Sequence, residues 1–128
     1  MQKNLEYILD TSSVMAYILG ETSALKLQDI LSRSAIPFIV LTETYYLLLR
    51  RMSRAQADQA LATLFNWPVV FLYPDQKICL LAAELKGLNR LGIADSFVAA
   101  YALEHSATLV TKDPDYKVLE PQLKLLKF

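Results

Sequence analysis

The segment Tyr7-Ile8-Leu9-Asp10-Thr11-Ser12-Ser13 sets the pattern from which the fold of this chain can be worked out. A short apolar run ends in a carboxylate, and hydroxyl residues that can cap a helix follow at once. Continuously apolar runs of this length are typical of strands covered on both faces. The segment therefore predicts a buried strand, a turn and then a helix, with Asp10 at the junction.

Similar apolar runs recur along the chain, and helical patterns fill the intervals. We expect strands at residues 5–9, 37–41, 69–72, 107–111 and 123–127. We expect helices at residues 12–19, 22–34, 42–51, 54–66, 75–89 and 94–105, and a short turn or helix from Pro114. Alternation of strands and helices at these lengths predicts an α/β sandwich with a mostly parallel sheet.

The size and composition fit one domain, residues 1–128. Hydrophobic residues make up 54% of the sequence. Because surplus apolar surface at this size usually becomes an interface, we expect a homodimer, a bound partner or both. The longest apolar runs are too short to span a bilayer, and no apolar signal region precedes the first strand. The expected location is therefore the cytoplasm, with no membrane attachment.

The charge balance and the cysteine count argue against only a few classes of function. Basic and acidic residues balance at 13 each, whereas nucleic-acid binders are usually basic. A local patch can still contact phosphates, and the candidates are Arg50, Arg51, Arg54, Lys86 and Arg90. The only cysteine, Cys79, excludes an internal disulfide and a cysteine-based zinc site, and its apolar neighbours predict a core position.

Four acidic residues stand where an apolar strand ends or a helix begins: Asp10, Glu43, Asp95 and Asp113. Ligand sites in open parallel sheets form outside the carboxyl ends of the strands, so carboxylates delivered there converge although they are distant in sequence. Clustered carboxylates repel one another unless a cation neutralises them, and hard oxygen ligands suit Mg²⁺ or Mn²⁺. The joint pattern predicts a divalent-metal site and metal-dependent phosphodiester chemistry.

Each position also has a structural interpretation. Asp10 can cap the helix that follows it, a role worth roughly 1 kcal/mol, although neighbouring hydroxyls could do the same. Asp113 before Pro114 is a familiar helix start. Glu43 after a Thr42 cap would lie in the first turn of a helix, where acidic residues complement the helix dipole.

Asp95 could complement the dipole of the helix that it opens, but a structural role explains this position least well. It shares a narrow apolar face of its helix with Val98, Ala99 and Ala102. An ionised carboxylate on such a face is costly unless it is paired or coordinates a metal, and small residues there let the helix approach the sheet closely. Near the fourth acid, the Thr111 hydroxyl could orient a water molecule at the metal, and Asp115 is expected to be exposed.

Four segments carry a resemblance to a known family: Leu9-Asp10-Thr11-Ser12, Thr42-Glu43, residues 93–100 and residues 109–116. In this order, and over essentially the whole chain, they closely resemble the PIN-domain ribonucleases, in particular the VapC-like toxins of prokaryotic toxin–antitoxin pairs. The last two segments are quite specific, whereas the first two alone would be weak.

The resemblance implies a three-layer α/β/α sandwich around the sheet, usually dimeric, with an acidic pocket that binds Mg²⁺ or Mn²⁺ and cleaves RNA endonucleolytically. By motif, the acidic ligands fall on Asp10, Glu43, Asp95 and Asp113, and the hydroxyl residue falls on Thr111. It also implies a small antitoxin partner that covers the pocket, often with an arginine.

The expected mechanism is attack on phosphorus by a metal-activated water, which leaves 5′-phosphate and 3′-hydroxyl ends. The single histidine, His105, cannot supply the histidine pair of a metal-free ribonuclease. Two alternatives stay open at this stage. One is a Mg²⁺-dependent phosphatase or phosphoryl-acceptor domain built on Asp10. The other is a non-catalytic regulatory module whose carboxylates only cap helices.

Overall fold

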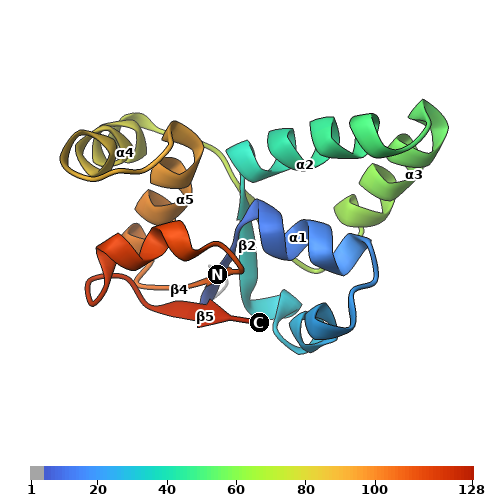
Figure 1. The fold of residues 1–128 in the computed structure, drawn as a ribbon, viewed down its shortest axis with the longest axis horizontal. Helices are drawn as coiled ribbons and strands as arrows, with labels where there is room; N and C mark the ends of the chain where they lie inside the picture. The colour runs from blue at the N-terminus through green and yellow to red at the C-terminus, as the bar shows by residue number, and fades with distance from the viewer. Residues whose placement is uncertain (1–4) are drawn as a thin grey trace.

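Five short strands form one sheet in the computed structural model, which describes residues 5–128 (Figure 1). They are β1 (Tyr7–Leu9), β2 (Ser34–Pro37), β3 (Val70–Leu72), β4 (Thr108–Thr111) and β5 (Leu125–Lys127). All pairings are parallel, in the order β3-β2-β1-β4-β5. The expected absence of a signal region before the first strand concerns residues 1–4, which lie outside the described residues.

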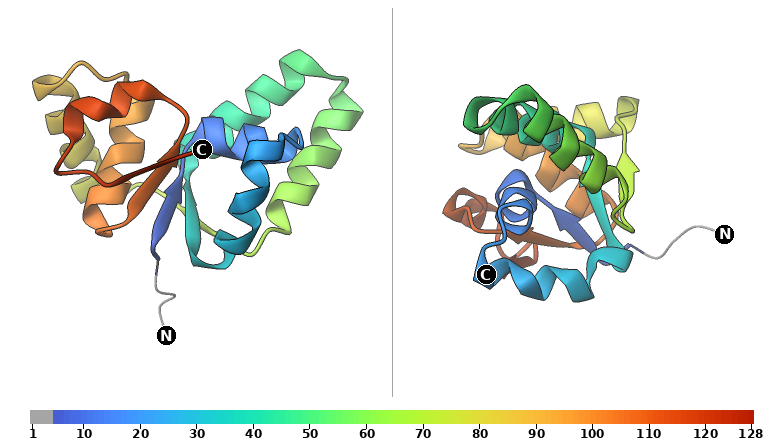
Figure 2. Two further views of the ribbon diagram at one scale, coloured as in Figure 1. Left: turned by 60° about the horizontal axis from the view of Figure 1, so that its bottom comes forward. Right: turned by 90° about the vertical axis from the view of Figure 1, so that its right-hand side faces the viewer.

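The α-helices are α1 (Thr11–Ile18), α2 (Phe38–Arg51), α3 (Arg54–Phe65), α4 (Gln76–Leu88) and α5 (Ile93–Glu104). The shorter 3-10 segments are η1 (Thr22–Asp29), η2 (Leu31–Arg33) and η3 (Pro114–Leu119). In the left view of Figure 2, α4 and α5 lie on one side of the central strands, and α1, η1 and α3 lie on the other. This arrangement is the expected α/β/α sandwich. Within residues 5–128, no helix combines the length and apolarity needed to cross a bilayer.

The strand order reverses at β1. The chain runs outward from β1 through β2 to β3 and then returns to place β4 on the other side of β1. Ligand crevices in such sheets form at the carboxyl ends of the strands where the order reverses. Leu9 pairs with Val110 in the last register position of β1, so the residues just beyond these two strands, including Asp10, face a common edge.

The hydrophobic core lies between α5 and the apolar strands that the sequence predicted. Ile8, Leu9, Leu109 and Val110 have no exposed surface, as predicted for strands covered on both faces. The helix α5 packs on β1, β2 and β4. It does so through small buried side chains, which confirms the close approach expected from the sequence: Ala99, Ala100 and Ala102.

The second strand and its helix lie earlier than the sequence pattern predicted. The strand ends at Pro37 and α2 begins at Phe38, so the expected strand 37–41 is wrong beyond its first residue. The apolar run instead supplies the first turn of α2, where Val40 is buried and its neighbours are half-buried. Short apolar runs do not distinguish strand from buried helix by periodicity alone.

Two further expectations need correction. The helix expected at residues 22–34 is broken into the 3-10 segments η1 and η2, and Ser34 already belongs to β2. Leu27, Ile30 and Leu31 are nevertheless buried, as their spacing indicated. Cys79 is exposed rather than buried, because α4 turns Ile78 and its helical neighbours inward and leaves the next position in solvent.

The helices α2 and α3 form a hairpin that extends from the rest of the molecule (Figure 1). A capping box starts α3, since the Ser53 hydroxyl accepts a hydrogen bond from the Gln56 backbone and the Gln56 side chain accepts one from the Ser53 backbone. A small separate cluster holds the hairpin against α1: Met15, Leu48 and Ala57. The hairpin also reaches the main core through Val40 on α2 and Leu64 on α3.

The close approach of α5 to the sheet gives a stability prediction. Ala99→Leu should lower the free energy of unfolding by about 1–3 kcal/mol, because extra methyl groups in a packed core force neighbours apart. Urea denaturation monitored by circular dichroism measures this loss. The control is Ala83→Leu on the exposed face of α4. Equal denaturation midpoints for the two variants would contradict the packing of α5.

Candidate metal centre

Asp10 lies buried at the end of β1, with 4% of its surface exposed. Its Oδ1 accepts hydrogen bonds from the Ser13 backbone (3.0 Å) and the Ser12 hydroxyl (2.7 Å). Its Oδ2 accepts one from the Thr111 hydroxyl. Asp10 thus caps α1 as the structural interpretation proposed, and at the same time it faces the end of β4. None of the neighbouring hydroxyls replaces it as the cap: Ser12 donates to the carboxylate, Thr11 to Glu43, and Ser13 to the Asp10 carbonyl.

Thr111 connects Asp10 to the next acidic residue. Its hydroxyl donates to Asp10 and accepts a hydrogen bond from the Asp113 backbone at 2.9 Å. Ser12 adds a second link, since its hydroxyl accepts from the Lys112 backbone at 3.0 Å. Thr111 is fully buried, so the structure places its hydroxyl between two acidic segments. This placement suits a positioning role for Thr111.

Glu43 reaches the same region from α2. Its Oε1 accepts a hydrogen bond from the Thr11 hydroxyl at 2.7 Å, which ties α2 to the start of α1. Because α2 begins at Phe38, Glu43 lies in the second turn of the helix rather than in the first, and Thr42 is not its cap. The Thr42 hydroxyl instead donates to the Phe38 carbonyl. The dipole interpretation of Glu43 therefore loses its basis.

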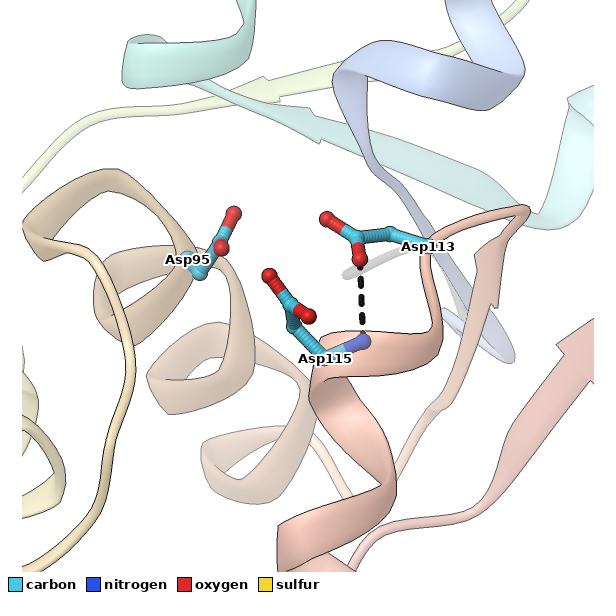
Figure 3. A group of neighbouring side chains, drawn as sticks. All are labelled: Asp95, Asp113 and Asp115. Carbon is cyan, nitrogen blue, oxygen red and sulfur yellow. Dashed lines mark hydrogen bonds between the residues drawn. The ribbon is translucent and has the colours of Figure 1, made fainter.

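Three aspartates converge from α5 and from the turn after β4 (Figure 3). Asp95, Asp113 and Asp115 each contribute a carboxylate oxygen, and these oxygens lie within 4.8 Å of one another. Asp113 caps η3, since its Oδ1 accepts from the Asp115 backbone at 2.9 Å, and Pro114 follows as expected. Asp95 lies in the first turn of α5, whose cap is Gly92.

The buried Tyr116 side chain supports Asp95 through a hydrogen bond. The side chain is buried, and its hydroxyl donates to Asp95 Oδ1 at 3.1 Å. Burial and the charges of Asp10 and Asp95 raise the pKa of the Tyr116 phenol far above its usual value of 10.0. The hydroxyl consequently stays protonated, and it remains a hydrogen-bond donor to the carboxylate.

The pocket carries an excess of negative charge that its own hydrogen bonds do not remove. Burial raises the pKa of Asp10 above its ordinary value of 3.8, although the hydrogen bonds from Thr111, Ser12 and Ser13 oppose the shift. Burial also raises the pKa of Asp95, and the charges of Asp113, Glu43 and Asp10 raise it further. Carboxylates from four separate segments therefore interact electrostatically at one edge of the sheet.

The donor set fits a hard divalent cation. Every candidate ligand atom in the pocket is a carboxylate or hydroxyl oxygen, which suits Mg²⁺ or Mn²⁺ better than a metal that prefers nitrogen or sulfur. Within residues 5–128, the three carboxylates close enough to share one ion are those of Asp95, Asp113 and Asp115. Asp10 and Glu43 lie outside that group but close enough for their charges to raise the pKa of Asp95.

Sequence reasoning underestimated two residues of the pocket. Asp115 is exposed, as expected, yet its carboxylate joins the group. The signal was its place two residues after the helix cap Asp113, which turns it toward the same space. Tyr116 carries no sequence signal of its own, since its spacing indicates only a core aromatic residue.

The raised pKa values predict how pH acts on the metal-free protein. A carboxyl whose pKa is raised by folding binds its proton more tightly in the native state, so stability falls as pH rises from about 3.8 through the raised pKa. Asp95→Asn should flatten this decline and stabilise the metal-free protein at neutral pH. Urea denaturation in EDTA across this range tests it. The exposed Asp29→Asn variant, the control, should keep the wild-type slope.

Comparisons with known proteins agree with this architecture. A chain of VapBC2 from Rickettsia felis, solved bound to a DNA fragment of the promoter, has a TM-score of 0.79 at 25% identity, and the match covers 97% of this chain and 99% of that one. DNA-bound VapBC from Salmonella typhimurium gives 0.76 at 21% identity, with 96% and 98% covered. Mycobacterium tuberculosis VapC20, described as a Sarcin-Ricin loop cleaving toxin, gives 0.73 at 18% identity, with 90% and 95% covered.

The matching family model covers nearly the same part of the chain as the four segments that carry the resemblance. No curated protein matches the chain at a significant level. The family model of the PIN domain matches residues 7–120, a range that includes β1, β4, α5 and every acidic residue of the pocket. The chain therefore belongs to the PIN domain family.

Proposed function

We propose that this protein is a divalent-metal-dependent endoribonuclease and the toxin of a toxin–antitoxin pair. The observation that carries the proposal is the convergence of Asp95, Asp113 and Asp115, with Asp10 and Glu43 beside them. A bound Mg²⁺ or Mn²⁺ would activate water for in-line attack on phosphorus and would stabilise the leaving oxygen. Asp95, Asp113 and Asp115 would hold the ion, and Asp10 and Glu43 beside them would complete the set of acidic ligands.

The remaining residues of the pocket have positioning roles in this proposal. Thr111 and Ser12 hold the Asp10 carboxylate at the end of β4. Tyr116 fixes Asp95 Oδ1 and leaves the second oxygen of that carboxylate for the ion. Thr11 likewise donates to Glu43 Oε1 and leaves the second oxygen of that carboxylate for the ion. Ligands held in this way lose little conformational freedom when the ion binds, which favours binding.

The toxin assignment and its antitoxin partner rest on the solved relatives. One similar structure is described as a toxin–antitoxin complex from Klebsiella pneumoniae, and others are VapBC-1 from Haemophilus influenzae and VapBC from Salmonella typhimurium. RNA as the substrate is supported by the description of VapC20 as a toxin that cleaves the Sarcin-Ricin loop. An antitoxin that covers the pocket would offer the acidic cluster a cationic side chain. Homodimerisation stays a prediction from the apolar surface.

Two alternatives are less well supported. A phosphoryl-acceptor site usually pairs adjacent acids at the first strand with a lysine that binds phosphate. Here Thr11 follows Asp10, and the Lys112 ammonium is engaged by Glu21 at 2.9 Å. A module whose carboxylates only cap helices explains Asp10 and Asp113. It does not explain Asp95 and Asp115, which cap nothing.

The first test combines metal binding with cleavage. Millimolar Mn²⁺ should raise the melting temperature, because an ion that binds only the native state stabilises it by mass action. Asp113→Asn should abolish most of this rise and slow RNA cleavage by about a hundredfold or more, since even loss of an outer partner of a metal ligand costs about 10- to 100-fold. Differential scanning fluorimetry and a gel assay measure the two effects, with Asp29→Asn as the control.

The products distinguish the reaction type. Cleavage by an activated water should give 5′-phosphate and 3′-hydroxyl ends, which kinase labelling and ligation identify. Cyclic 2′,3′-phosphate ends would exclude the mechanism. Transfer of phosphate from a small acyl phosphate to the protein, without RNA cleavage, would favour the phosphoryl-acceptor alternative.

A further inference from the structure

The helix α2 carries a ridge of three side chains that begins at the acidic pocket. Glu43, Tyr46 and Arg50 occupy positions i, i+3 and i+7, which lie along one face of a helix. Glu43 is bonded to Thr11 at the pocket. Seven residues of helix place Arg50 about 10 Å farther along the axis. The ridge therefore leads from the pocket along the projecting hairpin (Figure 1).

The outer part of the ridge is a cation–π pair of an arginine and a tyrosine. Arg50 Cζ lies 5.2 Å from the centroid of the Tyr46 ring, and Tyr46 is 41% exposed. None of the ion pairs formed among residues 5–128 involves Arg50. Among these residues the guanidinium charge is thus not neutralised by a carboxylate, and it lies against the Tyr46 ring at the surface.

An apolar groove of about 390 Å³ adjoins this pair. Its lining is Leu41, Thr42, Tyr45, Tyr46, Leu61 and Phe65. Tyr45 is held there by its hydrogen bond to Asp58 on α3, and Asp58 also pairs with Arg54 at 3.4 Å. The nearest acid on α3 is therefore already engaged, and it leaves the charge of Arg50 available to a ligand.

Single-stranded RNA carries the chemical groups that this surface can bind. Unstacked bases stack on aromatic rings and on arginine guanidinium planes, and backbone phosphates pair with unneutralised cations. The acidic pocket repels the RNA backbone, so a binding site beside it needs a compensating positive charge within a short distance. Arg50 can supply this charge. It lies about 10 Å along the helix from Glu43, which is about one Debye length at ordinary salt concentrations.

We propose that the Tyr46–Arg50 pair is a subsite for single-stranded RNA beside the scissile bond. Arg50 contacts a backbone phosphate, and the stacked pair supports one unstacked base. The inference rests on the proposed ribonuclease function and adds where the substrate is held. Apolar peptides also fit grooves, but an apolar peptide would leave the unneutralised charge of Arg50 without a partner.

The test measures binding and cleavage separately. Binding uses a fluorescein-labelled, short single-stranded RNA of random sequence and the Asp113→Asn protein as background, so that the RNA stays intact. Tyr46→Leu in this background should weaken binding by about 5- to 150-fold, the usual effect of losing one stacking residue. Tyr73→Leu, which removes an exposed tyrosine outside the groove, should bind as the background does.

Arginine variants separate charge from stacking. Arg50→Gln should reduce the slope of log affinity against log salt by about 0.7, the value expected for one lost phosphate contact on a single strand. Arg50→Lys should keep this slope but lose the stacking part of the affinity, because an ammonium has no plane. Arg51→Gln removes the same charge one residue along α2, on another face, and should leave the slope unchanged.

Steady-state cleavage with otherwise wild-type protein completes the test. Tyr46→Leu should raise KM with kcat near the wild-type value, since the pair lies outside the reacting group. If wild-type protein cleaves RNA and neither Tyr46→Leu nor Arg50→Gln changes KM or binding, the subsite is wrong while the ribonuclease function stands. Unchanged RNA binding together with weaker binding of a protein partner would assign the groove to that partner. If the wild-type protein neither binds nor cleaves RNA, both proposals fail.

Discussion

The buried carboxylate of Asp10 holds together the edge of the sheet on which the site is built. Its two oxygens accept hydrogen bonds from the backbone of Ser13 and from the hydroxyls of Ser12 and Thr111. These donors come from α1 and from β4, which are far apart in sequence and meet where the strand order reverses. A buried charge is tolerated only when such bonds replace its water. One side chain thereby fixes the start of α1 relative to the end of β4.

The other acidic side chains of the pocket add negative charge around the buried carboxylate of Asp10. Asp113 comes two residues after Thr111, whose hydroxyl accepts a hydrogen bond from the Asp113 backbone. The helix α5 brings Asp95 alongside because its alanines let it pack closely on β1 and β4. Hydroxyl donors hold one oxygen of Asp95 and one of Glu43. Repulsion among these groups is a cost that a divalent cation relieves. Fixed oxygen ligands and excess negative charge are the properties that suit a pocket to such an ion.

The sequence predicted the parts of this frame that depend on local pattern. β1, β4 and α5 are nearly where their apolar runs placed them, and Asp10, Asp95 and Asp113 stand at their ends. The start of α2 was misplaced because a run of apolar residues buries equally well in a strand or in a helix. Glu43 still reaches the pocket, since its contact with Thr11 depends on how α2 packs against α1. Asp115 was underestimated because exposure alone does not tell which space an exposed carboxylate faces.

The two hydrophobic clusters suggest how such a frame tolerates variation in what it binds. The main core joins the sheet to α4, α5 and one face of α1, and it also takes in Val40 from α2 and Leu64 from α3. Met15, Leu48 and Ala57 form a second cluster between the other face of α1 and the outer part of the hairpin. Substitutions in the outer part of α2 are therefore less coupled to the strands that position Asp10 and Asp113 than substitutions in its first turns. In the proposed function, the chemistry lies at the Glu43 end of α2 and recognition lies at the Arg50 end.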